Sequence, residues 1–546
     1  MTRTDVPRAG RREWIGLAVL ALACLLYVMD LTVLHLAVPA ISESLKPSSA
    51  QLLWIIDIYG FSVAGFLVTM GTLGDRIGRR RLLLIGAAAF GALSLLAAFS
   101  TSPEMLILSR ALLGIAGATL APSTLSLIFS MFQDPRQRAV AIGVWISAFS
   151  AGSAIGPVLG GLLLEHFWWG SVFLLALPVM ALLLILGPIV LPEYKDPNAG
   201  RLDIASAVMS LVAVLAVIFG LKEIAQDGIG ALPLGSILVG LVVGSLFVRR
   251  QLSLVDPMID LRLFRIPAFS ASLAVNFLGI FVAVGYFLFV AQFLQLVVGL
   301  SPLQAGAWSV PSALGFVLGS NMAPRIVRRV RAAYVMGAGL ALAATGLAVL
   351  TRVDGANSLG VVVIGSVIIS LGLAPVLSLT TELIVGSAPP ERAGAASGIS
   401  ETAAELGGAL GIAVLGSIGV ALYRGHVAAG LPGTVPADAA VIARDTLGGA
   451  VVVAGQLPGQ LGAAVLDVAR DAFVQGMQAA ATISAVLAML VAVLAVTLLR
   501  KVGSGADREA DADAAANGTR DDAIAEHDHE RPPRETRRPA AAAADA

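Results

Sequence analysis

The chain has 546 residues, of which 57% are hydrophobic and 13% are charged, and its formal net charge is zero. A soluble protein carries about 25% charged residues, so this composition indicates an integral membrane protein. The single cysteine, Cys24, excludes a disulfide within the chain and a thiolate metal site, and the balanced charge gives no indication of a nucleic-acid partner.

Long apolar stretches recur along the chain. About 20 apolar residues are needed to cross the roughly 30 Å hydrocarbon core of a bilayer as a helix. This criterion predicts an all-α membrane protein with fourteen transmembrane helices. The predicted spans are 14–36, 51–73, 82–100, 104–128, 138–162, 169–191, 204–221, 231–248, 268–297, 304–327, 333–350, 359–387, 395–422 and 474–500.

The positive charges lie mainly in alternate connections between these spans. Cytoplasmic loops of membrane proteins carry an excess of Lys and Arg, so we expect both chain ends in the cytoplasm and a multi-pass protein of a bacterial inner membrane. Residues 1–13 then form a cytoplasmic N-terminus. Residues 424–473 form an external loop with short amphipathic helices, and residues 501–546 form a disordered cytoplasmic tail because they lack large apolar side chains.

Charged residues inside the predicted spans are the first candidates for function, because they are costly in a membrane. Asp30 and Asp57 fall in the outer half of the first two helices, and Arg110 falls in the fourth at a similar depth. For each of these residues an alternative to a functional role stays open. Asp30 could form a structural ion pair with Arg110, Asp57 could be wetted at the outer mouth, and Arg110 could extend to the outer interface.

Two further acids, Glu401 and Glu405, lie one turn apart in the thirteenth predicted helix. Residues four apart share a helix face, and two close carboxylates in a low dielectric resist double ionisation. We therefore expect one of them to hold a proton near neutral pH. The alternative is that Glu401 reaches the cytoplasmic interface.

The stretch "GTLGDRIGRRR" at 71–81 joins the second and third helices. Its glycines, Gly71 and Gly78, permit close backbone approach, and its charges also suit a generic positive loop. Its pattern, Gly-x-Leu-Gly-Asp-Arg-x-Gly-Arg-Arg, resembles the signature loop of the major facilitator superfamily. The resemblance implies that this loop is a conformational latch on the cytoplasmic side, which docks on its expected receiver, the segment "PPERAGAASG" at 389–398. The latch residues are Gly71, Asp75, Arg76, Gly78 and Arg79.

The stretch "AGSAIGPVLGG" at 151–161 spaces small residues four apart, which lets two helices pack closely, and its proline favours a kink. Its full form is similar to the antiporter motif of the facilitators and implies exchange rather than symport. The motif residues are Gly152, Gly156, Pro157, Gly160 and Gly161.

Together with "DLTVLHLAVP" and "ETAAELGGALG", these motifs make residues 14–500 resemble the fourteen-helix drug:proton antiporters, most closely exporters of quaternary ammonium compounds and dyes. The resemblance implies two six-helix bundles, 14–191 and 268–500, joined by a linker, 192–267, that contains two inserted helices. It also links Arg110 to proton transfer. We assign proton coupling to Asp30 and Glu405 because a carboxylate buried away from water can bind and release a proton near neutral pH, and the alternative that this pair and the pair Asp57 and Glu401 exchange roles stays open.

We assign the substrate's charge to Asp57 and Glu401, and cation–π contacts to aromatic residues of the central helices. The expected partners are lipophilic cations, protons and the bilayer. No nucleotide loop or metal cluster is evident, so we expect neither an enzyme nor a cofactor, and we expect a monomer. Export of an endogenous antibiotic or lipid metabolite stays open, as does, less favoured, a non-transporting scaffold or sensor. The aromatic candidates are Tyr59, Trp145, Phe149, Phe281, Tyr286 and Phe287.

Overall fold

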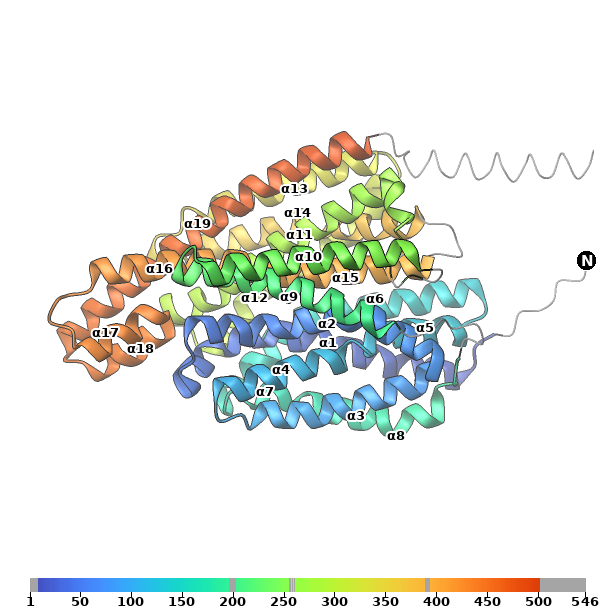
Figure 1. Ribbon diagram of the computed structural model, residues 1–546, viewed down its shortest axis with the longest axis horizontal. Coiled ribbons are helices and arrows are strands. Elements are labelled where there is room, and N and C mark those ends of the chain that lie inside the picture. The colour runs from blue at the N-terminus through green and yellow to red at the C-terminus, as the bar shows by residue number, and fades with distance from the viewer. Residues whose placement is uncertain are drawn as a thin grey trace, which may run out of the picture.

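The computed structural model describes residues 8–195, 203–254, 257, 259, 261–387 and 393–500. Within these ranges the chain forms long helices that run side by side along one axis (Figure 1). Twelve of the described helices are long and apolar enough to cross a membrane, and two more, α6 and α12, run alongside them. The prediction of an all-helical protein with fourteen spans is confirmed in outline. The predictions for residues 1–7 and 501–546 lie outside the described residues.

The N-terminal half, residues 8–195, contains the first six spans. Two of them are interrupted: α4 and α5 together form the fourth span, and α7 and α8 form the sixth. Ser48 begins α2 with a capping box, because its side chain accepts from the Gln51 amide at 3.2 Å while the Gln51 side chain accepts from the Ser48 amide at 2.9 Å. The elements are α1 (Arg11–Leu45), α2 (Ser49–Ile77), α3 (Arg79–Ala98), α4 (Pro103–Gly117), α5 (Leu120–Met131), α6 (Pro135–His166), α7 (Ser171–Leu174) and α8 (Ala176–Val190).

The inserted pair, α9 (Ile204–Asp227) and α10 (Ala231–Ser253), packs against the side of the bundle. Ile218 of α9 lies in one apolar cluster with Phe61 of α2 and Ala409 of α15, so α9 covers the seam between these two helices. At the start of α9, Asp203 binds Arg250 of α10 at 2.9 Å. Burial acts to raise the pKa of Asp203, but hydrogen bonds from Arg250 and Ser206 outweigh it and lower the pKa to about 2. The ion pair between Asp203 and Arg250 therefore stays charged at physiological pH.

The C-terminal half, residues 261–500, contains the remaining spans. The ninth and thirteenth spans each include one π-helical turn, η2 and η5. The elements are η1 (Leu263–Arg265), α11 (Pro267–Gln292), η2 (Phe293–Val297), α12 (Pro302–Val327), α13 (Ala332–Leu350), η3 (Gly355–Ser358), α14 (Leu359–Gly386), α15 (Ala393–Gly411), η5 (Ile412–Gly416), α16 (Ser417–Gly430), α17 (Ala437–Asp445), α18 (Leu447–Gln456) and α19 (Gly459–Leu499).

Helices α17 and α18 project from one end of the bundle, opposite the end where α19 finishes (Figure 1). We call the end that carries α17 and α18 the cap end. The two halves meet there through polar contacts: Ser49 donates to Asp445 at 2.8 Å, Gln295 to the Leu36 carbonyl at 3.0 Å, and Ser301 to Glu165 at 2.9 Å. The predicted short amphipathic helices of the loop 424–473 correspond to α17 and α18.

Candidate functional site

A cavity of about 410 Å³ lies between the two halves. The N-terminal half contributes wall residues from α1, α2, α4 and α6, and the C-terminal half contributes them from α11, α12, α14 and α15. Most of these side chains are apolar. A mainly apolar cavity with a few polar groups is the usual form of a small-molecule site.

Three charged residues line this cavity. Asp57 of α2 and Arg110 of α4 come from the N-terminal half, and Glu405 of α15 comes from the C-terminal half. Glu405 accepts a hydrogen bond from the hydroxyl of Tyr27 on α1. A Cβ atom added to Gly60 of α2 would lie 3.9 Å from Glu405 Oε2, so α2 and α15 are close at this carboxylate. The cavity wall thus carries one carboxylate from each half.

Arg110 is completely buried and does not extend to the outer interface. Its Nη1 atom binds Asp30 Oδ2 of α1 at 2.5 Å, and its Nε atom donates to the Ile55 carbonyl at 3.3 Å. Its guanidinium carbon also lies 4.4 Å from the centre of the Tyr59 ring. The ion pair that sequence reasoning left as an alternative for Asp30 is therefore the contact that this structure contains.

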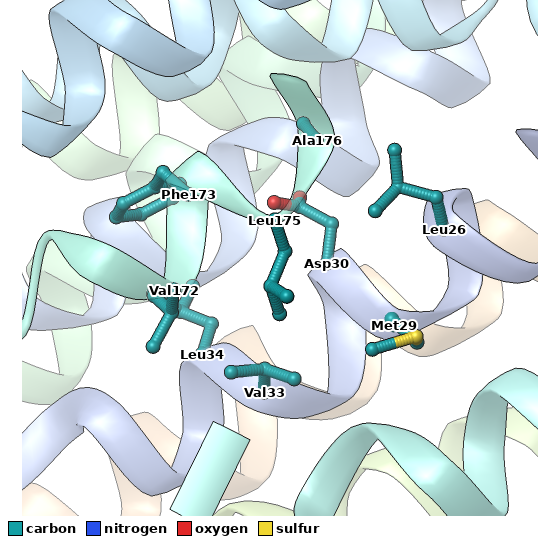
Figure 2. A pocket seen from close by; sticks show the side chains of 9 residues that line it. All are labelled: Leu26, Met29, Asp30, Val33, Leu34, Val172, Phe173, Leu175 and Ala176. Carbon is teal, nitrogen blue, oxygen red and sulfur yellow. The ribbon is translucent and has the colours of Figure 1, made fainter. Parts of the chain in front are cut away.

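Asp30 points away from the large cavity. The cavity-lining residues of α1 are Val28, Thr32, His35 and Leu36, which share one helix face, and Asp30 lies on the opposite face. There it borders a separate cavity of about 10 Å³, beside Phe173, Leu175 and Ala176 of the α7–α8 segment (Figure 2). Such a volume is about the size of one water molecule. Arg110 connects Asp30 to the wall of the large cavity.

The other predicted site residues lie at different places. Tyr286 and Phe287 line the cavity, with ring centres 4.7 Å apart. Tyr59 lies behind the wall, under Arg110, and Trp145 donates to Thr124 of α5 at 3.1 Å. Neither of these two is among the lining residues, and Phe281 is also absent from them. The side chain of Phe149 lies outside the described part of the chain.

Glu401 does not line the cavity either. It lies one turn before Glu405 on α15. Asp57 and Glu405 are the two carboxylates on the cavity wall. The sequence analysis had paired Asp30 with Glu405 for proton coupling and Asp57 with Glu401 for the substrate's charge, so the wall carries one member of each pair.

Several lining residues were not singled out from the sequence. They include His35 of α1 and, on α12, Trp308, Ser309, Ser312 and Phe316. Sequence analysis assigned no lining role to the tenth predicted span, which is now α12. Its wall residues recur at a spacing of three to four, but apolar residues on the lipid-facing side hide this period.

The predicted latch loop makes its described contacts within the N-terminal half. Arg79 donates to the Pro122 carbonyl of α5 at 3.4 Å, and the next residue, Arg80, forms a 3.5 Å ion pair with Glu193. Gly78 has a φ of 112°, a backbone conformation that favours glycine, and a Cβ atom added there would also require the Glu193 carboxylate to move. The Asp75 side chain and residues 389–392 of the expected receiver lie outside the described residues.

The glycines of the predicted antiporter motif pack α6 against two helices. An added Cβ atom at Gly152 would meet the Leu25 carbonyl oxygen at 2.6 Å, and one at Gly156 would meet Thr32 Oγ1 at 2.4 Å, both on α1. One at Gly161 would meet the Pro302 carbonyl oxygen of α12 at 2.5 Å. Gly160 faces Val33, and Pro157 lines the cavity. The motif therefore holds α1, α6 and α12 together beside the cavity.

Two helical halves around a central cavity, joined at one end of a membrane-spanning bundle, define the architecture of a small-molecule transporter. The sequence profile of the Major Facilitator Superfamily matches residues 20–412. The chain belongs to the Major Facilitator Superfamily. It is thus a multi-pass membrane transporter and not an enzyme.

Relatives match over nearly the whole chain. The multidrug efflux pump LfrA of Mycolicibacterium smegmatis is 42% identical, with 90% of this chain and 98% of the relative covered. The methyl viologen resistance protein SmvA of Salmonella typhimurium is 36% identical, with 88% and 97% covered. A solved inward-facing bacterial homolog of the human lysosomal transporter Spinster is similar in fold, with a TM-score of 0.62, 19% identity, and 91% and 100% of the two chains covered.

Proposed function

We propose that this protein is a multidrug efflux antiporter, which exports lipophilic cations across the bacterial inner membrane in exchange for protons. The names of the relatives support the efflux of drugs: one is a multidrug efflux pump and another confers resistance to methyl viologen. In this proposal the protein acts as a single chain. Both termini are cytoplasmic, and the cap end is outside.

The observation that carries the proposal is the pair of carboxylates on one apolar cavity, Asp57 from α2 and Glu405 from α15. A cation in the cavity is attracted by both carboxylates, whereas an anion is repelled. The nearby rings of Tyr286, Phe287 and Trp308 provide flat apolar surfaces and cation–π contacts. Charge and shape together favour flat or bulky organic cations.

Proton exchange follows from where the other charges lie. In the observed state, Asp30 neutralises Arg110, and Arg110 reaches the cavity wall. A proton on Asp30 leaves the arginine charge uncompensated, which repels a bound cation. A proton on Glu405 removes an attractive charge from the wall. Both events weaken cation binding, so proton binding and cation binding exclude each other, as exchange requires.

The latch loop and the antiporter motif have separate roles in this scheme. The motif keeps α1, α6 and α12 packed at the cavity. The halves are in contact at the cap end, and with the cap end outside, as we propose, this state would be the one closed toward the outside. We assign the loop, with Asp75, Arg76 and Arg79, to the opposite state, in which the cytoplasmic side closes.

The test is ethidium transport in inverted membrane vesicles with an imposed pH gradient. We expect uptake that a protonophore abolishes, and no uptake of an anionic dye of similar size. Asp57→Asn and Glu405→Gln should each lower uptake at least tenfold at equal expression. Uptake that persists without a proton gradient overturns the proton coupling. No uptake of any lipophilic cation, together with export of a neutral metabolite, favours the alternative of an endogenous substrate.

A further inference from the structure

Asp30 has one carboxylate oxygen that its ion pair with Arg110 does not use. Arg110 Nη1 binds the other oxygen, Oδ2, at 2.5 Å. Oδ1 has no hydrogen-bond partner within the described part of the chain, and yet it is not one of the fully buried atoms. The Asp30 side chain keeps 10% of its surface accessible. Oδ1 is therefore both unpartnered and open to a neighbouring space.

That space is the small cavity between α1 and the α7–α8 segment (Figure 2). Its volume of about 10 Å³ is that of one water molecule. The segment is broken at Leu175, whose N–H donates to the Phe173 carbonyl, two residues back instead of four. Pro178, in the first turn of α8, has no N–H to donate to the Leu174 carbonyl. The cavity thus lies between an unpartnered carboxylate oxygen and a break in the regular backbone hydrogen bonds.

The facing segment has no side chain that could carry a proton to Asp30. Residues 171–190, which form α7, Leu175 and α8, contain no acidic or basic side chain. The titratable groups that interact with Asp30 include Arg110 and Tyr59, which belong to α4 and α2. On the side of the α7–α8 segment, water is therefore the carrier that can bring a proton to Oδ1.

The segment also leads from the small cavity to the cap end. The turn that joins α6 to α7 lies there, because Glu165, near the end of α6, contacts the C-terminal half at the cap end. Trp168 in this turn is 45% exposed. Ser171 begins α7, between the turn and the cavity-lining Val172, and its buried hydroxyl has no partner in the described residues. Buried hydroxyls without a protein partner are normally satisfied by water.

We propose that the small cavity is a water site through which protons reach Asp30 from the cap end, apart from the large cavity that receives the substrate. This inference rests on the proposed function and adds the path of the proton to it. A hydronium ion at the site transfers one proton to Asp30 Oδ1 and leaves a neutral water molecule. The neutral carboxylic acid then no longer compensates Arg110 on the wall of the large cavity. Proton entry and cation release thus occur on different sides of Arg110.

The experiment fills the water site with groups of one shape and two polarities. Ala176 is buried and lines the site. Ala176→Val places two methyl groups there, whereas Ala176→Thr has nearly the same shape and places a hydroxyl group that can itself accept and donate a proton. Val172→Ile fills the same site if Ala176→Val does not fold.

The large cavity is blocked separately, as the matched comparison. Ser309→Cys introduces a thiol on its wall, and a bulky maleimide attached there closes the substrate's space. The native Cys24 is buried. The readout is protonation of Asp30 itself, followed as the infrared band of its carboxylic acid after a rapid drop in pH. The band is assigned by its absence from the Asp30→Asn protein.

We expect Ala176→Val to slow the protonation of Asp30 at least about tenfold, as the loss of a positioned proton carrier does. Ala176→Thr should slow it far less. The blocked Ser309→Cys protein should protonate Asp30 at the rate of the unmodified protein. The dissociation constant for tetraphenylphosphonium, measured at constant pH, should be the same for the two Ala176 variants.

Equal slowing by Ala176→Val and Ala176→Thr would assign the effect to packing and overturn the water site. An unchanged rate in Ala176→Val, or a slower rate in the blocked protein alone, would place the path in the large cavity and overturn it as well. A band of Asp30 that never appears would exclude any path to this residue. Exchange of tetraphenylphosphonium for protons by the unmodified protein tests the proposed function separately, so the two failures are distinguishable.

Discussion

Tyr27 of α1 donates its hydroxyl hydrogen to Oε1 of Glu405 on α15, and this bond joins the two halves at the cavity wall. The two rings of Tyr27 and Tyr59 are 6.2 Å apart, and Tyr59 lies under Arg110. An ion pair, a cation–π contact, a contact between two rings and a hydrogen bond therefore connect Asp30 through Arg110, Tyr59 and Tyr27 to Glu405. Both proposed proton sites belong to this set of contacts.

Replacement of Tyr27 by Phe should lower proton-driven transport about tenfold, because a hydrogen bond to a carboxylate is worth about 1.5–3 kcal/mol. The measurement is ethidium transport under a pH gradient at equal protein levels. Tyr423→Phe is the control, since the Tyr423 hydroxyl donates to the Ala443 carbonyl at 2.8 Å, near the cap end and outside the large cavity. Unchanged transport by the Tyr27→Phe protein would contradict a role for this bond in coupling.

Replacement of Asp30 by Asn should abolish proton-driven transport and also destabilise the protein. Removal of one partner from a buried ion pair costs about 3–5 kcal/mol, because the other charge stays buried without compensation. The double variant Asp30→Asn, Arg110→Met should recover melting temperature but not transport. If the double variant recovers transport as well, the pair is structural and does not couple protons.

Replacement of Gly156 by Ala should reduce stability and transport, since the new methyl group meets Thr32 Oγ1 on α1. Overpacking of this kind costs about 1–3 kcal/mol. Thr32→Ala removes the contacting atom and should restore much of the melting temperature. Gly152→Ala should resist such rescue by any side-chain change on α1, because its methyl group meets the Leu25 backbone carbonyl. If Thr32→Ala restored the melting temperature of both glycine variants equally, the specific contacts of Gly152 and Gly156 with α1 would not be what determines stability.

The proposed orientation predicts that the cap end faces outward. Val441 of α17 is 66% exposed, and the native Cys24 is buried, so Val441→Cys introduces one reactive thiol. A membrane-impermeant maleimide should label it in intact cells. Tyr194→Cys, at the opposite end of the bundle, should be labelled after permeabilisation alone. The reverse labelling pattern would invert the topology.

The sequence predicted the helices well but not which way their side chains face. Membrane helices are recognised by continuous apolar length, and this signal located nearly all spans. The same uniform hydrophobicity hides which face is toward the cavity. Asp30 and His35 occupy one apolar run, and packing alone decides that His35 lines the cavity while Asp30 faces α7 and α8.

Helix ends deviated from the prediction for a related reason. The last span was predicted from residue 474, but α19 begins at Gly459, because its first turns include the charged residues Asp467, Arg470 and Asp471 and pack beside α18. The first helix likewise continues through Pro39 to Leu45, beyond the predicted end at residue 36. The breaks between α4 and α5 and the π-helical turns carry no sequence signal that we recognised.

The most direct test of the account is proton movement caused by substrate. Purified protein is placed in liposomes that contain a pH-sensitive dye, with the membrane potential clamped, and a lipophilic cation such as tetraphenylphosphonium is added outside. We predict that the interior becomes alkaline as the cation enters in exchange for protons, and that the double variant Asp30→Asn, Glu405→Gln gives no such change. Cation entry without a change in internal pH, or a normal response of the double variant, would contradict proton exchange through these carboxylates.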